Sequence, residues 1–271
     1  MIQLNDAGID ATASAKLLEY QNLVNGKATY AERVEEAKSK FKSYNRKGNA
    51  TFDEVKKQLN VMCCGPERCN YCEDSKADEV EHIYPKDWYP DKCFVWGNYC
   101  YACGTCNGPK NNKYAIFKRE DDTYLELIRE KDATIVAPED GDAVLINPRD
   151  ENPLKFLFLD INRSFFFVPV EANTAEKDNV RATYTIKILG LNSRSYLVKA
   201  RKLAFSNFRS RLSDYITHRD LGVDQNQLDE MIKNIKEEHH QTVWREMIRQ
   251  RDHHPVLQNL FNRAPEATGW I

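Results

Sequence analysis

The most regular pattern of apolar and polar residues lies near the amino terminus. Apolar residues recur there at steps of three and four among charged residues, at Tyr30, Val34, Ala37, Phe41 and Tyr44. This spacing predicts an amphipathic helix. After a break at residues 45–49, Thr51 to Glu54 has the form of a capping box and predicts a second short helix that runs to about Leu59. We therefore expect an N-terminal helical region over residues 1–60.

The second half of the chain contains both the alternating pattern of strands and the spacing of three and four typical of helices. Residues 156–159 and 165–168 are apolar and flank Asp160-Ile-Asn-Arg163, which predicts a short β-hairpin. Tyr184, Ile186 and Ile188 alternate with polar residues and predict a half-buried strand that ends at Gly190. Helical spacing follows from Leu197 to Tyr215, at residues 231–235 and at residues 243–248. Residues 121–271 are thus expected to form a mainly helical α+β accessory region.

Composition limits the possible function classes. The chain has 271 residues, 41% hydrophobic and 30% charged, which is typical of a folded globular protein with one large or two smaller domains. Its net charge of −2 lacks the strong positive charge of many nucleic-acid-binding domains, so such a role would need locally gathered cations or a partner. No apolar run is long enough for a membrane span, and Met1 to Asp6 do not look like a secretion signal. We expect a cytoplasmic protein without a membrane partner.

All eight cysteines lie between Cys63 and Cys106, which favours metal binding over disulfides in a reducing compartment. Two Cys-x-x-Cys pairs stand out, Cys69 with Cys72 and Cys103 with Cys106. Two such turns can hold one tetrahedral Zn²⁺, so we predict a structural zinc site. The surplus Cys63, Cys64, Cys93 and Cys100 are expected to be free thiols. Cys100, three residues before Cys103, leaves an alternative downstream pair open.

A closed four-thiolate site leaves no coordination position for catalysis, so any chemistry must come from the enclosed loop. That loop contains Glu81-His82-Ile-Tyr-Pro-Lys86 and Trp96-Gly-Asn98, and Asn107, Lys110 and Lys113 follow the second pair. Each residue also has an ordinary explanation. Glu81 fits a solvated charge, Asn107 a helix cap and Trp96 a core aromatic.

In this order, residues 69–113 resemble the zinc-stapled branch of the HNH nucleases. The resemblance implies a ββα-metal core at residues 61–120, in which a β-hairpin carries the histidine and a helix packs across it. It implies that His82 is the general base and that Glu81 and Asn107 hold one Mg²⁺ or Mn²⁺ ion. Asn98 would fix the backbone around His82. Glu81 departs from the aspartate that is frequent at this position.

The lysines near this motif are candidate phosphate contacts. Lys110 and Lys113 lie one turn apart if the segment is helical, so both could reach a nucleic-acid backbone from one face. Lys86 follows the histidine motif and is a third candidate.

A wider resemblance adds Ile146-Asn-Pro-Arg149 and Ile188-Leu-Gly-Leu-Asn192 to the same motifs. Together, over residues 63–260, they look like the stand-alone HNH proteins of bacterial antiphage modules such as Septu and its retron-linked relatives. This resemblance implies an ABC/SMC-like ATPase as protein partner. Asn147 to Arg149 also fit an ordinary turn.

The expected architecture is therefore α+β, with a zinc-stapled ββα-metal (HNH) core in a mainly helical chain that also has a short β-hairpin. The expected function is hydrolysis of DNA phosphodiester bonds as the effector of an antiphage complex. A non-catalytic zinc-ribbon scaffold and an HNH nuclease that acts on RNA are the alternatives. The remaining histidines are mostly expected at the surface; they are His218, His239, His240, His253 and His254.

Overall fold

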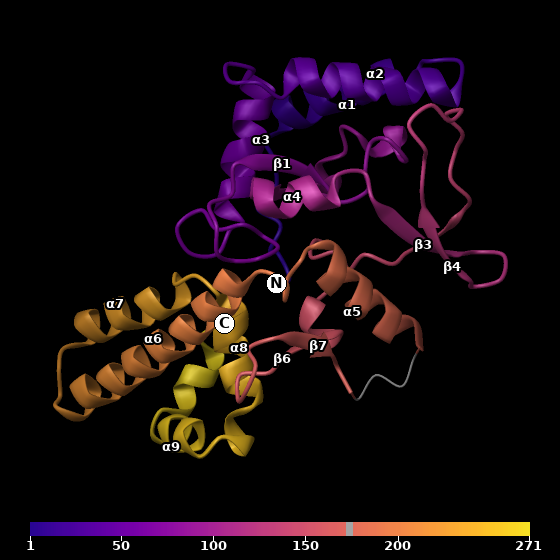
Figure 1. Ribbon diagram of the computed structural model, residues 1–271. Helices are drawn as coiled ribbons and strands as arrows, with labels where there is room; N and C mark the ends of the chain where they lie inside the picture. The colour runs from indigo at the N-terminus through magenta and orange to yellow at the C-terminus, as the bar shows by residue number, and fades with distance from the viewer. Residues whose placement is uncertain (172–175) are drawn as a thin grey trace.

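Helices make up most of the fold, and three small antiparallel sheets lie among them (Figure 1). The computed structural model describes residues 1–171 and 176–271. Its helices are α1 (Ala11–Asn25), α2 (Tyr30–Tyr44), α3 (Ala50–Val61), α4 (Gly104–Lys110), α5 (Glu176–Ile188), α6 (Ser195–Asp220), α7 (Gln225–Lys236), α8 (Gln241–Arg249) and α9 (Pro255–Arg263). Its strands are β1 (Glu79–His82), β2 (Tyr99–Ala102), β3 (Tyr114–Lys118), β4 (Tyr124–Leu127), β5 (Gly141–Ala143), β6 (Leu157–Leu159) and β7 (Phe167–Pro169). The expected α+β class is confirmed.

The N-terminal helices start at polar caps. The predicted helix from Tyr30 is confirmed as α2, and Thr29 and Glu32 form its capping box. The predicted capping box at Thr51 is wrong, because Asn49 caps α3 by accepting a hydrogen bond from the Phe52 N–H, and Thr51 lies inside the helix. Helix α1 was not predicted.

The centre of the upper half in Figure 1 is a two-stranded sheet followed by a short helix. Strands β1 and β2 pair antiparallel, with His82 opposite Tyr99 and Glu81 opposite Cys100. Helix α4 follows β2 closely, with Cys103 between them as its N-cap residue. The local order is therefore β-β-α, as the resemblance implied.

Two further sheets extend the fold. Strand β3 pairs with both β4 and β5, a sheet that was not predicted. A Cβ at Gly141 would lie 2.3 Å from the Phe117 carbonyl oxygen, so this close pairing requires a glycine. Strands β6 and β7 form the predicted hairpin, with Phe158 opposite Val168.

The predicted strand at residues 183–188 is wrong, because these residues form the end of helix α5. Thr185, a polar position that the alternating pattern assigned to solvent, is fully buried and accepts a hydrogen bond from the Ile146 N–H at 3.1 Å. Gly190 has a φ of +57°. This left-handed conformation is common directly after helices and explains why glycine ends this segment.

The three predicted helical segments of the C-terminal region are confirmed as parts of α6, α7 and α8. Buried apolar side chains from Met1 to Trp270 form one core. His240 corrects the expectation of surface histidines, because it is buried and in a left-handed conformation just before α8. In residues 1–171 and 176–271, no helix combines the length and apolar character needed to cross a bilayer. The division into regions at residues 60 and 120 stays a prediction.

Candidate active site and metal centre

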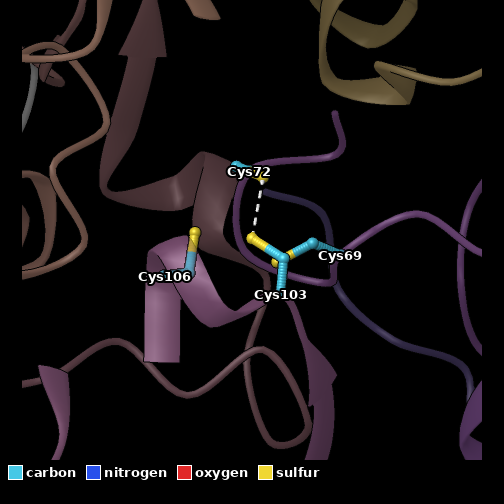
Figure 2. A group of neighbouring side chains, drawn as sticks. All are labelled: Cys69, Cys72, Cys103 and Cys106. Atoms are coloured by element: carbon cyan, nitrogen blue, oxygen red, sulfur yellow. Dashed lines mark hydrogen bonds between the residues drawn. The ribbon is translucent and has the colours of Figure 1, made fainter. Parts of the chain in front are cut away.

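Four cysteine side chains converge near the start of α4. The Sγ atoms of Cys69, Cys72, Cys103 and Cys106 all lie within 4.8 Å of one another and are buried (Figure 2). Cys72 Sγ and Cys103 Sγ are 3.9 Å apart. A tetrahedral zinc ion with bonds of about 2.3 Å separates its sulfurs by about 3.8 Å. The donor set and its spacing are consistent with zinc.

Backbone hydrogen bonds hold both cysteine turns in place. The Glu73 N–H donates to the Cys69 carbonyl, and the Cys106 N–H donates to the Cys103 carbonyl, both at 2.9 Å. Asn70 joins the first turn to β2, since its N–H donates to the Tyr101 carbonyl and its side chain accepts from the Tyr101 N–H. Cys100 lies inside β2 and outside the cluster, which decides the alternative pairing in favour of Cys103 with Cys106.

The C-terminal half contacts this cluster directly. Arg194, in the turn between α5 and α6, places Nη2 3.2 Å from Cys106 Sγ. Nη2 also donates to the Leu189 carbonyl, and Nε donates to the Gly190 carbonyl. A guanidinium held in this way offsets negative charge on the thiolates.

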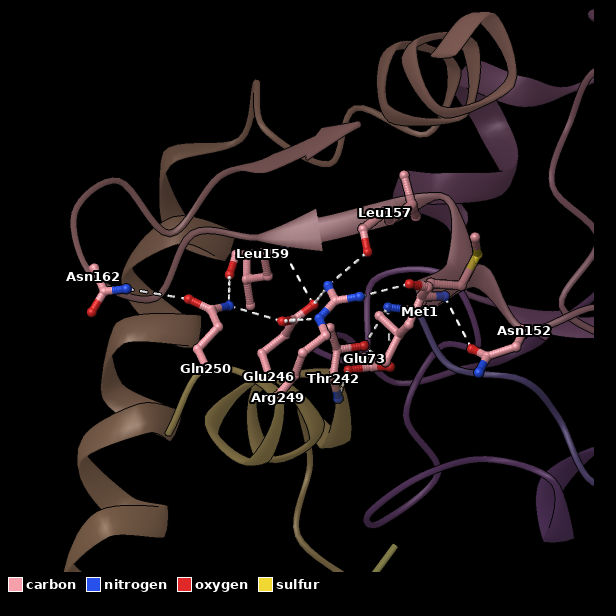
Figure 3. Close-up of polar contacts among 11 residues, drawn as sticks. Met1, Glu73, Asn152, Leu157, Leu159, Asn162, Thr242, Glu246, Arg249 and Gln250 are labelled. Carbon is pink, nitrogen blue, oxygen red and sulfur yellow. Dashed lines mark hydrogen bonds and ion pairs between the residues drawn. The ribbon is translucent and has the colours of Figure 1, made fainter. Parts of the chain in front are cut away.

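Glu73, the residue after Cys72, joins the same cluster to α8 (Figure 3). Its carboxylate accepts hydrogen bonds from the Thr242 N–H and hydroxyl at 3.0 and 2.7 Å, and it pairs with the Met1 amino group at 3.1 Å. Burial alone would raise the pKa of Glu73, but the amino group and the hydrogen bonds from Thr242 lower it. Figure 3 also shows the neighbouring polar network of Glu246, Arg249 and Gln250, which fastens α8 to β6.

His82 is the last residue of β1, and its ring is held on three sides. Nε2 lies 2.8 Å from the Cys93 carbonyl oxygen. Because a carbonyl only accepts, the neutral ring carries its proton on Nε2, which leaves Nδ1 as the acceptor. The rings of Phe41 and Tyr99 pack edge-on against the imidazole, with distances between ring centres of 4.4 and 5.2 Å. Burial, together with the positive charge of Lys86, lowers the pKa of His82 to about 3.

Glu81 precedes His82 and forms a buried ion pair with Lys110. Glu81 Oε1 contacts Lys110 Nζ, and both side chains are almost inaccessible, at 4% and 0% exposure. Nζ also donates to the His82 carbonyl at 2.8 Å. Burial raises the pKa of Glu81, and the Lys110 ammonium acts against that shift.

Asn98 connects the two ends of the loop between β1 and β2. Its Oδ1 accepts from the Tyr84 N–H at 2.7 Å, and its Nδ2 donates to the Tyr84 and Lys92 carbonyls at 3.0 and 2.9 Å. The Asn98 carbonyl also accepts from the Ile83 N–H at 2.9 Å. The side chain therefore fixes the chain on the C-terminal side of His82.

Asn107 completes the group from helix α4. Its Nδ2 donates to Glu79 Oε2 at 2.7 Å, so Oδ1 takes no part in this hydrogen bond. A cavity of about 110 Å³ is lined by Glu81, His82 and Asn107 together with Lys86. The structure thus places the expected base and both expected oxygen ligands around one small cavity.

The three lysines differ in position. Lys86 lines this cavity and Lys113 is exposed, whereas Lys110 is fully buried. The expected phosphate contact of Lys110 does not match this arrangement, since its ammonium pairs with Glu81. Trp96, expected in the core, is only partly buried at the core's edge and donates from its indole to Asp6 at 3.0 Å.

The motif did not reveal the structural roles of three residues of the site, one of which, Lys110, it had indicated only as a phosphate contact. Phe41 packs on the imidazole, Lys110 pairs with Glu81 and Arg194 contacts Cys106. The helical pattern at Phe41 indicated a buried face, but not what it covers. Nothing in the sequence near Arg194 indicated a metal neighbour.

Comparison with known proteins gives one partial similarity. An 81-residue segment is 36% identical to the Septu protein PtuB of Bacillus thuringiensis. It covers 28% of this chain and 31% of that protein, so the chain aligns with about a third of the relative's length. The chain matches no protein-family model. The chain is thus distantly similar to part of a Septu component, in line with the resemblance drawn from its motifs.

Proposed function

We propose that this protein is an HNH endonuclease that hydrolyses DNA phosphodiester bonds with a divalent cation. The observation that carries the proposal is the shared cavity of about 110 Å³ lined by His82, Glu81 and Asn107. A group of buried thiols that only pinned a scaffold would not require a histidine and two oxygen-bearing side chains at one cavity.

His82 has the form that a general base needs. Its Nε2 is occupied by the Cys93 carbonyl, and its lowered pKa keeps the ring neutral at neutral pH, although the same shift makes the ring a weaker base than a free imidazole. Nδ1 can therefore accept a proton from water that attacks phosphorus. Phe41, Tyr99 and Asn98 restrict the ring and the adjoining loop, so the base is positioned before substrate binds.

Glu81 and Asn107 would hold the catalytic cation, Mg²⁺ or Mn²⁺. Both carry side-chain oxygen atoms, the ligand type that hard divalent cations prefer, and Glu81 has Oε2 besides the Oε1 that contacts Lys110. The cavity of about 110 Å³ has room for an ion with a few waters, since a water occupies about 30 Å³ of liquid. When bound, the ion would neutralise charge on the scissile phosphate and the leaving oxygen. Lys86, at the same cavity, adds positive charge that attracts the phosphate.

The biological role that we propose is the effector of a Septu-type antiphage complex in the cytoplasm. The partial similarity to PtuB supports this role, together with the motif resemblance. An ABC/SMC-like ATPase is the proposed partner. Such a partner would supply phosphate-binding surface that a chain of net charge −2 lacks.

The test is a cleavage assay with plasmid DNA and Mg²⁺ or Mn²⁺, with and without the protein encoded next to this one in the genome. We expect His82→Ala to lower the cleavage rate at least about 100-fold, the lower end of general-base contributions. The matched control is His218→Ala, because His218 lies on α6 and contacts Asp214 of the same helix.

Three other outcomes would contradict parts of the proposal. Equal cleavage by wild type and His82→Ala would remove His82 as the base. No cleavage in any condition by zinc-loaded protein would favour the non-catalytic scaffold. Faster cleavage of RNA than of DNA in direct competition would reassign the substrate.

A further inference from the structure

A second, larger cavity adjoins the one that contains His82. It has a volume of about 470 Å³, within the range of about 300–1,000 Å³ typical of ligand sites. The end of α4, strand β4 and helix α5 contribute its lining. Asn112 lines both cavities, so the two are direct neighbours.

Hydrogen bonds stabilise the wall between the cavities. The Trp88 indole donates to the Asn112 carbonyl at 2.9 Å. The Arg129 guanidinium lies 4.0 Å from the centre of the Trp88 ring and donates to the Asp87 carbonyl at 2.9 Å. The Lys113 N–H donates to the carbonyl of Lys110, the last residue of α4, at 2.8 Å, so Lys113 is held close to the end of that helix.

The lining of this second cavity is positively charged. Lys113, Arg129 and Lys187 line it, against one carboxylate, Glu126, which accepts a hydrogen bond from the Tyr124 hydroxyl. Lys113 and Lys187 are exposed. Among the described residues no carboxylate pairs with any of these three cations. In a chain of net charge −2, three cations that have no carboxylate partner among the described residues are a local concentration of positive charge around one cavity.

Other residues of the lining are apolar or aromatic. Leu127 and Tyr184 are buried, Ile188 is half-buried, and Ile128 at the lip is 72% exposed. Cations beside an apolar and aromatic wall match the two chemical parts of a nucleotide, a phosphate and a ring system.

We propose that this cavity binds the nucleotide next to the scissile phosphodiester of a DNA strand. The phosphate of that nucleotide lies at Lys113 and Lys187, and its sugar and base lie against Tyr184 and Ile188. This inference rests on the proposed function, because only a strand that passes the His82 cavity reaches both sites. Because Asn112 lines both cavities, adjacent nucleotides of one strand could occupy the two cavities at the same time.

The first experiment measures binding of a fluorescein-labelled DNA duplex by anisotropy, in a His82→Ala background so that the probe is not cut. Lys113→Gln with Lys187→Gln removes two phosphate contacts. We expect affinity at about 0.1 M salt to fall roughly 10- to 100-fold and the salt slope to drop by about 0.9, because both lysines contact the same phosphate. The control is Lys199→Gln with Lys202→Gln on α6, where two exposed lysines change net charge equally.

A second experiment locates the DNA. Ile128 at the lip is replaced by the photo-crosslinker benzoylphenylalanine, and Val61, 68% exposed at the end of α3, is the control position. We expect irradiation to crosslink DNA to position 128 and not to position 61.

The outcomes separate this site from the active site. Unchanged affinity of the Lys113/Lys187 variant, or equal crosslinking at both positions, overturns the nucleotide site while the His82 cleavage test can still succeed. Weakened binding together with undiminished cleavage by His82→Ala supports the nucleotide site and overturns the catalytic assignment. No DNA binding by the parent at low salt overturns both.

Discussion

The buried ion pair between Glu81 and Lys110 gives the sharpest test of the site's architecture. Lys110→Met keeps much of the side-chain volume but removes the ammonium, and it leaves a carboxylate with 4% exposure without its charge partner. It also removes the hydrogen bond from Nζ to the His82 carbonyl. Breaking a buried pair in this way costs about 3–5 kcal/mol. We expect the free energy of unfolding to fall by that amount.

A double-mutant cycle isolates the pair. Glu81→Gln removes the charge that Lys110 faces, so the variant with both changes should be less destabilised than the sum of the single variants, by about 1–3 kcal/mol. The assay is equilibrium unfolding in guanidinium chloride with zinc present and no magnesium. Lys113→Met, three residues further along and exposed, should change stability by less than about 0.5 kcal/mol.

Two results would refute this reasoning. If Lys110→Met were as neutral as Lys113→Met, the ammonium would not be buried against Glu81. If the two single effects simply added, the residues would not interact, and Lys110 would again be a candidate for phosphate contact.

Three further predictions concern the metal centre and the loop. Cys106→Ser should abolish binding of about one zinc per chain while Cys100→Ala retains it, as measured by elemental analysis; zinc loss in both would reopen the choice of ligands. Arg194→Gln removes the guanidinium 3.2 Å from Cys106 Sγ and should weaken zinc binding about 10-fold in competition with a chromogenic chelator, with Arg194→Lys in between; wild-type affinity would argue against a charge effect. Asn98→Ala removes three side-chain hydrogen bonds and should lower the free energy of unfolding by about 2–4 kcal/mol. A loss below about 0.5 kcal/mol would show that the loop keeps its conformation without these hydrogen bonds.

Local spacing explains why the metal cluster was predictable. A Cys-x-x-Cys turn places both thiols by short-range geometry, and residues 103–106 show this directly, with the Cys106 N–H bonded to the Cys103 carbonyl. Cys100 could not be excluded from the sequence, because only the pairing of β1 with β2 places it opposite Glu81 and outside the cluster.

The parts that sequence missed depend on contacts between distant segments. From the sequence alone, Lys110 looks like a solvent-exposed cation, and only the fold places it beside Glu81. Arg194 likewise looks like a surface residue, and only the packing of the α5–α6 turn places it beside Cys106. Residues 183–188 have alternating hydrophobicity, but burial of Thr185 against Ile146 is decided by tertiary packing. A short apolar pattern can belong to either structure, and here packing selected the helix.

The contacts of Glu73 and Arg194 with the cysteine turns also bear on how the protein matures. The thiols lie at residues 69–106, whereas Arg194, which contacts Cys106, and Thr242, which donates to Glu73, come much later in the chain. During synthesis from the amino terminus, the ion can therefore be captured before the C-terminal helices leave the ribosome. Those helices would then pack against a cluster that already holds its zinc ion. In a cell short of zinc, we expect chains in which the contacts between the cysteine turns and the C-terminal half are weakened.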